Sequence, residues 1–223
     1  MIVRPCARAR QLLGLVVLML GLLCGQAQRC PPRPITVPDA LVLVIEHGEN
    51  SYQFARECDW TRAGREYAWY AVGLSALDAA VIGRYAAKNE LQATVCSLYD
   101  AIVHRDRIDA MTASSRIIAI AVGLCGPYNP APPVDVMRLE CCGRTLEIAA
   151  ESGDHPACMV AVADITRTWR VARPVVVSRG GRAVAVRFDH CVAQLYAATT
   201  PARVKQLIPL YVDTTQKVKG VFL

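Results

Sequence analysis

Residues 174–186 read PVVVSRGGRAVAV, and the expected fold depends on how this stretch is interpreted. Two valine-rich runs, 174–178 and 182–186, flank Arg179-Gly180-Gly181. β-Branched residues are enriched in strands, and paired glycines accept the positive φ angles of a tight hairpin turn. The stretch therefore predicts a β-hairpin in which one or both faces bury Val175, Val177, Val184 and Val186.

Two more apolar runs, Leu41–Ile45 and Met159–Ala163, are short enough to predict strands as well. A turn is expected at His47-Gly48-Glu49-Asn50. Downstream of the hairpin the chain is expected to return to helix at Asp189–Ala198. A last helix is expected from the cap Thr200, which precedes a proline at the first helical position, to about Val212.

The middle of the chain, from about Leu74 to Leu124, has helical periodicity instead. Asn89 is a suitable N-cap, and the residues after it form an apolar stripe at Leu91, Val95, Leu98 and Ile102. Another helix is expected to begin at Thr112 or Ser114, and the proline-rich residues 126–133 separate the two halves. The sequence thus predicts an α+β fold with a helical N-terminal half, a small antiparallel sheet with a hairpin, and C-terminal helices.

The N-terminal residues have the pattern of a secretory signal. Three arginines precede an apolar run at Leu12–Leu23, and small residues follow at Gly25 and Ala27. The domain prediction is a signal peptide at 1–27, a proline-rich extended arm at 28–40, a single disulfide-rich α+β domain at 41–215 and a loose tail at 216–223. The expected localisation is the secretory pathway.

Charge and hydropathy narrow the function class. Of the 25 cationic residues, three lie in residues 1–27, which leaves a balance of about +3 for the rest of the chain against 19 acidic residues. Nucleic-acid-binding proteins usually have a stronger, clustered basic surface, so no nucleic-acid partner is expected. No second apolar stretch is long enough to cross a bilayer, so membrane association is expected only through a partner.

The sequence contains ten cysteines. Removal of the signal leaves eight, and an even count in an exported chain predicts a disulfide-stabilised fold whose connectivity stays open. Adjacent cysteines at 141 and 142 are expected to form bridges in two directions, one of which could reach another chain. The candidates for intrachain bridges are Cys58, Cys96, Cys141, Cys142, Cys158 and Cys191.

No catalytic or metal site is predicted, and no cofactor. His155 and Cys158 have the spacing of zinc ligands, but only one histidine joins that cluster and disulfides compete for the thiols. Asp189-His190-Cys191 lacks the geometry of a catalytic triad, because adjacent helical side chains point in different directions. The protein is expected not to be an enzyme. The aromatic residues are either ordinary core residues or anchors for binding a partner. The candidate partner-binding residues are Tyr52, Trp60 and Trp69.

Several short matches in sequence order resemble glycoprotein L of herpesviruses, particularly of betaherpesviruses. They cover most of the chain after the signal, and each is thin. The matching segments are Cys30-Pro31, Val44–Tyr52, Leu77-Asp78, Tyr85, Asn89, Leu91, Leu98, Cys125-Gly126, Cys142-Gly143-Arg144, Val160–Val162, Thr166-Arg167, Arg170, Arg173–Val175 and Leu195-Tyr196. The chain departs from the family in the spacing of Cys125 and Cys141, in Cys58 and Cys191, and in having no N-glycosylation site.

The resemblance implies a non-catalytic subunit of the virion envelope and host cell surface. Such a subunit binds and helps fold glycoprotein H and supports membrane fusion during virus entry. It also implies accessory subunits that set cell tropism, with Cys30 as the candidate bridge to glycoprotein H and Cys125 as the candidate bridge to an accessory subunit. Two alternatives stay open: a secreted immunomodulator that binds a host cytokine or receptor, and a bacterial periplasmic enzyme or binding domain.

Overall fold

The fold was derived from a computed structural model, which describes residues 36–77 and 85–223. These residues contain eight α-helices and one short 3-10 helix, with no β-strand among them. The predicted α+β class is therefore wrong, and the described chain is all-helical. Thr36–Leu223 forms one compact unit. The helices are α2 Asp39–Arg56, α3 Trp60–Ala76, α4 Tyr85–His104, α5 Arg107–Leu124, η1 Gly126–Tyr128, α6 Val134–Glu151, α7 His155–Ser178, α8 Arg182–Tyr196 and α9 Pro201–Gly220.

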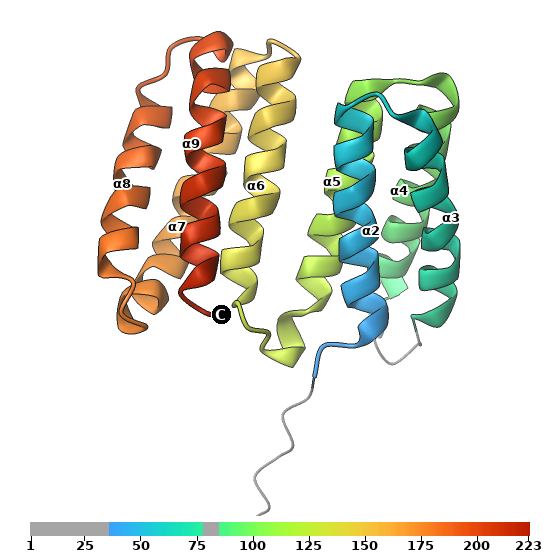
Figure 1. Cartoon of the computed structure of the whole chain (residues 1–223), viewed down its shortest axis with the longest axis horizontal. Coiled ribbons are helices and arrows are strands. Elements are labelled where there is room, and N and C mark those ends of the chain that lie inside the picture. Colours follow the sequence, from blue (N-terminus) through green and yellow to red (C-terminus); the bar gives the residue numbers. More distant parts are fainter. Residues whose placement is uncertain (1–35, 78–84) are drawn as a thin grey trace, which may run out of the picture. The chain divides into compact units, whose positions relative to one another are not determined.

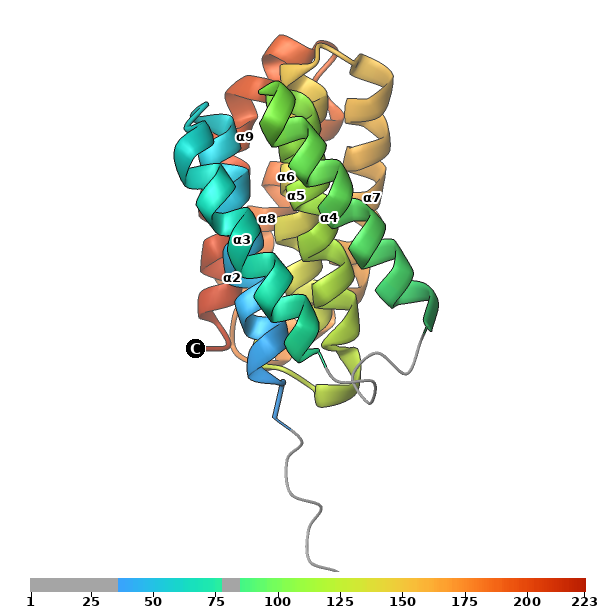
Figure 2. The ribbon, with the colours of Figure 1, turned by 90° about the vertical axis from the view of Figure 1, so that its right-hand side faces the viewer.

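The long helices form two groups of four, α2–α5 and α6–α9 (Figure 1). In the first group α2 packs against α3 and α5, and α4 packs against α5 and more sparsely against α3. Figure 2 views this group from the side of α3 and α4. Its core contains the predicted stripe residues Leu91, Val95 and Leu98, together with Leu41 and Ile117. The helical prediction for this region is confirmed for most of its length.

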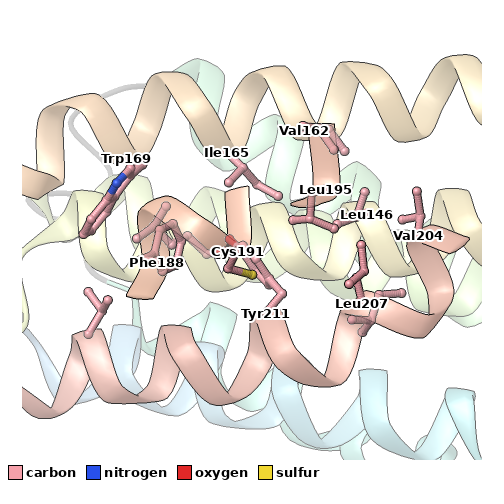
Figure 3. Close-up of a cluster of buried hydrophobic side chains, with 14 of the residues drawn as sticks. Leu146, Val162, Ile165, Trp169, Phe188, Cys191, Leu195, Val204, Leu207 and Tyr211 are labelled. Atoms are coloured by element: carbon pink, nitrogen blue, oxygen red, sulfur yellow. Dashed lines mark hydrogen bonds between the residues drawn. The ribbon is translucent and has the colours of Figure 1, made fainter. Parts of the chain in front are cut away.

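The core of the second group contains three buried aromatic rings (Figure 3). Trp169 of α7, Phe188 of α8 and Tyr211 of α9 form a row of rings, with centroid separations of 4.3 and 5.6 Å. The Tyr211 hydroxyl donates a hydrogen bond of 2.7 Å to the carbonyl of Leu139 on α6. The three rings thus connect α7, α8 and α9, and the hydrogen bond of Tyr211 connects them to α6.

The predicted hairpin at 174–186 is instead the junction between two helices, α7 and α8. Gly180 has a φ of +87°, so a tight turn does lie here, but helices enter and leave it. The buried residues Ala161, Ile165, Trp169, Ala172 and Val176 recur at intervals of three or four, so burial follows the period of a helix. This packing outweighs the low helix propensity of valine. Met159–Ala163 is part of the same helix and not a strand.

Other boundaries were misjudged because polar and proline residues were given too much weight. Leu41–Ile45 and the predicted turn at 47–50 both lie inside α2, where Gly48 lets Ile118 approach. Pro174 and Pro209 lie inside helices on exposed positions, where the carbonyls they leave unpaired can reach water. Asn89 lies inside α4, and α5 begins at Arg107 with Asp106 as its N-cap.

The C-terminal part is more regular than predicted. The helix beginning with the Thr200 cap is confirmed, but it extends to Gly220, so the predicted loose tail at 216–223 is wrong. Helix α8 begins at Arg182, seven residues before the predicted start. Val221 and Phe222 pack against the core of α6–α9 and anchor the end of the chain. The signal peptide and residues 28–35 of the predicted arm lie outside the described residues.

Disulfides do not stabilise the described part of the chain. Its seven cysteines are all unbridged, which corrects the expectation of a disulfide-stabilised fold. Most of these thiols are buried among apolar side chains, where cysteine packs as a small hydrophobic residue. The fold therefore depends on two apolar cores and not on covalent bridges.

Candidate functional site

A polar cleft lies between α2, α6 and α9. This cleft has a volume of about 260 Å³, and ionised side chains of both signs line it. Arg144 donates to Glu49 at 2.7 Å, and Arg56 donates to Glu147 at 3.3 Å. Lys219 and Gln216 both donate to Glu140, at 3.2 and 2.8 Å. The three cations and three carboxylates are paired across helices.

Tyr52 lies in the wall of this cleft and is 5 % exposed. Its hydroxyl donates a hydrogen bond of 2.8 Å to Glu147, and burial together with the Glu147 carboxylate raises the pKa of Tyr52. Nη1 of Arg144 is buried and has no hydrogen-bond partner in the described chain. The cleft therefore fixes α2 against α6 and α9 through a charge-balanced network. Tyr52 is a structural residue of this network and lies too deep to contact another protein directly.

Trp69 is exposed, in contrast, and yet it is held in place. It is 56 % exposed on α3, and its ring stacks on His47 of α2 with a centroid distance of 5.9 Å and an interplanar angle of 5°. Nδ1 of His47 lies 2.7 Å from Glu66 Oε2, which fixes the imidazole. An exposed tryptophan with a fixed orientation loses little conformational entropy on binding, which is the usual property of an interface anchor.

Helix α4 presents a second exposed apolar surface. Tyr99 is 49 % exposed and Val103 is 57 % exposed, four residues further along the same face, and the thiol of Cys96 is exposed one turn before them. The Tyr99 ring lies 5.0 Å from that of Tyr67 on α3. The sequence analysis missed this surface, although the spacing of Cys96, Tyr99 and Val103 is a helical period that could have indicated it.

An open groove of about 740 Å³ follows the other side of α4, along its contact with α5. Its floor consists of small side chains, including Ala93, Ser97 and Ala113. Carboxylates surround it: Glu90, Asp100, Asp106 and Asp109. Arg116 forms an ion pair with Glu90, and Asp106 caps α5, so two of these acids have structural partners.

The third candidate binding residue, Trp60, is only partly buried at the first position of α3 and packs against the core of α2–α5. The structure does not bring Tyr52, Trp60 and Trp69 together as one surface with a shared contact. Among the three, Trp69 alone presents most of its ring to solvent.

The cysteines differ in what they can reach. Cys125 is 1 % exposed, and its thiol donates to the carbonyl of Ala121, so a bridge to another chain would require the end of α5 to open. Cys58 and Cys96 are the exposed thiols in the described range, and Cys30 lies outside it. Burial raises the pKa of Cys141 to about 12 and that of Cys191 to about 11.

Cys141 and Cys142 point in different directions because they are neighbours on a helix. Cys141 packs with Ile118 and Val122 of α5, whereas the Cys142 thiol lies 3.9 Å from the Thr168 hydroxyl on α7. Burial also raises the pKa of Cys125, Cys142 and Cys158. These thiols are poor nucleophiles, because the reactive thiolate is disfavoured away from water.

Two polar motifs considered above as possible sites, Asp189-His190-Cys191 and the pair of His155 and Cys158, have structural roles in the fold. Asp189 accepts hydrogen bonds from the Trp169 indole at 2.7 Å and from Arg173, while His190 is exposed and Cys191 is buried. His155 begins α7 directly after its cap Asp154, and Cys158 is buried one turn later. In the described residues no group of three histidine, cysteine or acidic side chains could hold a metal ion.

None of the described helices has the length and hydropathy needed to cross a bilayer. Comparison with known proteins gave no relative: no protein-family model, no curated protein and no solved structure matches this chain.

Proposed function

We propose that this chain is an exported, non-catalytic protein that acts by binding a partner protein through the surface around Trp69. The observation that carries the proposal is an exposed tryptophan fixed by His47 and Glu66. The tyrosine and valine on α4 extend the exposed apolar area of the same four-helix group. Trp and Tyr are the residue types that dominate binding energy at interfaces.

The arrangement of polar groups supports binding over catalysis. The buried thiols have raised pKa values, the carboxylates of the central cleft are paired, and Asp189 is engaged by Trp169 and Arg173. A nucleophile needs a neighbouring base and an orienting group within hydrogen-bond reach, and the polar clusters described above do not form such a set.

The resemblance to glycoprotein L names one partner, glycoprotein H. Parts of that resemblance concerned a C-terminal strand pattern, and those segments are helices in this chain. The candidate partner thus rests on the matched residues and not on a shared strand arrangement.

The two cores within Thr36–Leu223 favour a second form of the same proposal. Each four-helix group buries its own apolar residues, which supports folding without a partner. A stand-alone secreted binder, such as an immunomodulator, would fold in this way.

The test is expression of the tagged full chain alone and beside the glycoprotein H ectodomain from the same source. Co-purification from the medium is expected, and Trp69→Ala should weaken it by about 30-fold, the effect of losing a binding anchor of about 2 kcal/mol. Tyr196→Ala is the matched control, because Tyr196 is 66 % exposed on α8, outside this surface.

Secretion alone with no detectable complex would reject glycoprotein H as the partner and leave the stand-alone binder. Equal binding by the Trp69→Ala and wild-type chains would reject the Trp69 surface.

A further inference from the structure

The hairpin of α7 and α8 carries an unusual charge distribution. Between Asp164 and Asp189 the chain has six arginines, no lysine and no carboxylate. All six are exposed: Arg167, Arg170, Arg173, Arg179, Arg182 and Arg187. They lie on the second half of α7, the connecting turn and the first half of α8, which are neighbours in the fold. We call these six residues the arginine face.

Within the described residues, two of these arginines have a carboxylate partner. Arg167 pairs with Asp164, and Arg173 forms a two-pronged pair with Asp189. Arg170, Arg179, Arg182 and Arg187 take part in no ion pair with the described residues. Like charges held close together repel one another and attract anions from solution. The arginine face is therefore a surface of uncompensated positive charge.

The shape and residue type of this surface limit the anions that fit. Arginine presents a planar fork of donors that matches the oxygens of sulfate, phosphate and carboxylate groups. The two cavities described above lie on other helices, and the six arginines line neither of them. Cations spread over two helices and a turn suit an extended chain with repeated anionic groups.

The surrounding side chains argue against two other polyanions. Single-stranded nucleic acids bind through bases stacked on exposed aromatic rings, whereas the aromatic residues of this stretch, Trp169 and Phe188, are buried. Membrane-surface helices bury Trp, Phe or Leu in the lipid. The exposed apolar residues here are three valines, Val171, Val175 and Val186, between 41 and 56 % exposed.

We propose that the arginine face binds a sulfated polysaccharide. The choice of sulfate over other anions rests on the export half of the proposed function, because sulfated polysaccharides are the linear polyanions of cell surfaces. The binding itself is a property of the folded chain and does not depend on Trp69 or on any protein partner.

The test uses the purified full chain and heparin as the probe. The variant Arg170→Gln, Arg182→Gln, Arg187→Gln should bind heparin 10- to 100-fold more weakly than wild type at 0.15 M salt. Each lost contact should also lower the slope of log K against log salt by about 1, and three should lower it by about 3.

The matched control is Arg65→Gln, Arg105→Gln, Arg203→Gln. These exposed arginines lie on other helices and loops and form no ion pair with a described carboxylate, so the net charge falls by the same amount. The control should bind heparin within about threefold of wild type. Circular dichroism of both triple variants checks that the helices are intact, which surface substitutions of this kind should preserve.

Four outcomes would overturn the proposal. Equal losses in the two triple variants would mean attraction by net charge alone. Undiminished binding of fully desulfated heparin would exclude sulfate recognition. Loss of binding in Val171→Ser, Val175→Ser would assign the surface to an apolar partner. Tighter binding to phosphatidylserine vesicles or to single-stranded RNA would assign it to lipid or nucleic acid. Failure of the Trp69 test would leave all four measurements unaffected.

Discussion

The two groups of four helices use their aromatic side chains differently, although each has a fully buried tyrosine, Tyr70 in α2–α5 and Tyr211 in α6–α9. In α6–α9 the rings of Trp169, Phe188 and Tyr211 pack in a row inside the core. In α2–α5 the rings of Trp69 and Tyr99 lie at the surface. Buried polar atoms without a hydrogen-bond partner among the described residues occur in both groups, such as the Ser114 hydroxyl in α2–α5 and Nη1 of Arg144 in α6–α9.

The contrast indicates that one group contributes mainly to stability and the other to binding. Contacts between buried rings stabilise the fold, while an exposed ring leaves apolar surface available for contact. The α6–α9 group should therefore contribute most of the stability, and α2–α5 should provide the protein-binding surface. The following substitutions test this division.

The largest effect is expected for Phe188→Ala. Phe188 is fully buried between the other two rings, so its removal should lower the free energy of unfolding by about 3–5 kcal/mol. Urea unfolding measures the loss, and hydrogen exchange should locate it in α6–α9. Tyr99→Ala is the comparison in the other group and should cost less than about 1 kcal/mol. An equal loss of protection in both groups would show that they unfold together.

Glycine substitutions test how far each core can yield. A Cβ on Gly143 would lie 2.6 Å from a ring carbon of Tyr211, whose hydroxyl is tied to α6, so Gly143→Ala should cost about 1–3 kcal/mol. A Cβ on Gly48 would lie 2.5 Å from Cγ1 of Ile118, a buried β-branched side chain whose χ1 angle is restricted in a helix. Gly48→Ala should therefore cost a similar amount.

Gly64→Ala is the control for helix propensity. No atom lies within 4 Å of a Cβ at this helical position, so alanine should stabilise the chain by up to about 1 kcal/mol. A clearly smaller cost at Gly48 than at Gly143 would contradict the expectation that the two cores yield to a similar extent.

Sequence reasoning recognised α4 and α5 because their apolar residues follow the helical period, but it predicted a strand and a turn inside α2 and placed no helix over most of α3. It found the Thr200 cap and the proline-rich break after Leu124 for the same kind of local reason. It failed at 174–186, because the β-branched valines suggested strands. What decides that stretch is burial at Ala172, Val176 and Ala185, which depends on contacts with α6 and α9.

The candidate sites were predicted less well than the helices. Trp69 was named as a candidate binding residue and is exposed in the structure, but nothing in the sequence places His47 beneath it, because the two residues lie on different helices. The arginine face was invisible as long as Arg179–Arg182 was taken as a hairpin turn. The net charge of the whole chain also hides local clusters of one sign.

An ion pair at the junction of the groups should give an intermediate effect. Glu151 of α6 accepts from Lys205 of α9 at 2.7 Å and from Arg107 of α5 at 3.0 Å, and these hydrogen bonds lower its pKa. Glu151→Gln should cost about 1–2 kcal/mol at pH 7. Because the folded-state pKa lies below the unfolded value of about 4.3, the contribution is complete above that pH.

The contribution of Glu151 should fall as pH drops through its folded pKa. The difference between wild type and Glu151→Gln in urea unfolding should therefore shrink in acid. A difference that stays constant down to pH 3 would mean that the carboxylate charge does not contribute.

The smallest effect is expected for the unpartnered hydroxyls. Ser114→Ala should be neutral or should stabilise the chain by up to about 1 kcal/mol, because the alanine removes a buried hydroxyl that forms no hydrogen bond with the described residues. Thr215→Val in the other group is the counterpart, since the Thr215 hydroxyl donates to the Tyr211 carbonyl at 2.9 Å. It should cost about 1 kcal/mol. Thermal unfolding of both variants would decide the sign.

The burial of the thiols determines which cysteines are oxidised first. Oxidation proceeds through the exposed thiolate, so Cys58 and Cys96 should accumulate sulfenic acid or mixed disulfides first during storage in air. Damage would begin as a change of surface chemistry, with helix packing intact. Within the described residues, the first oxidative changes would then involve two cysteines at the surface of α2–α5.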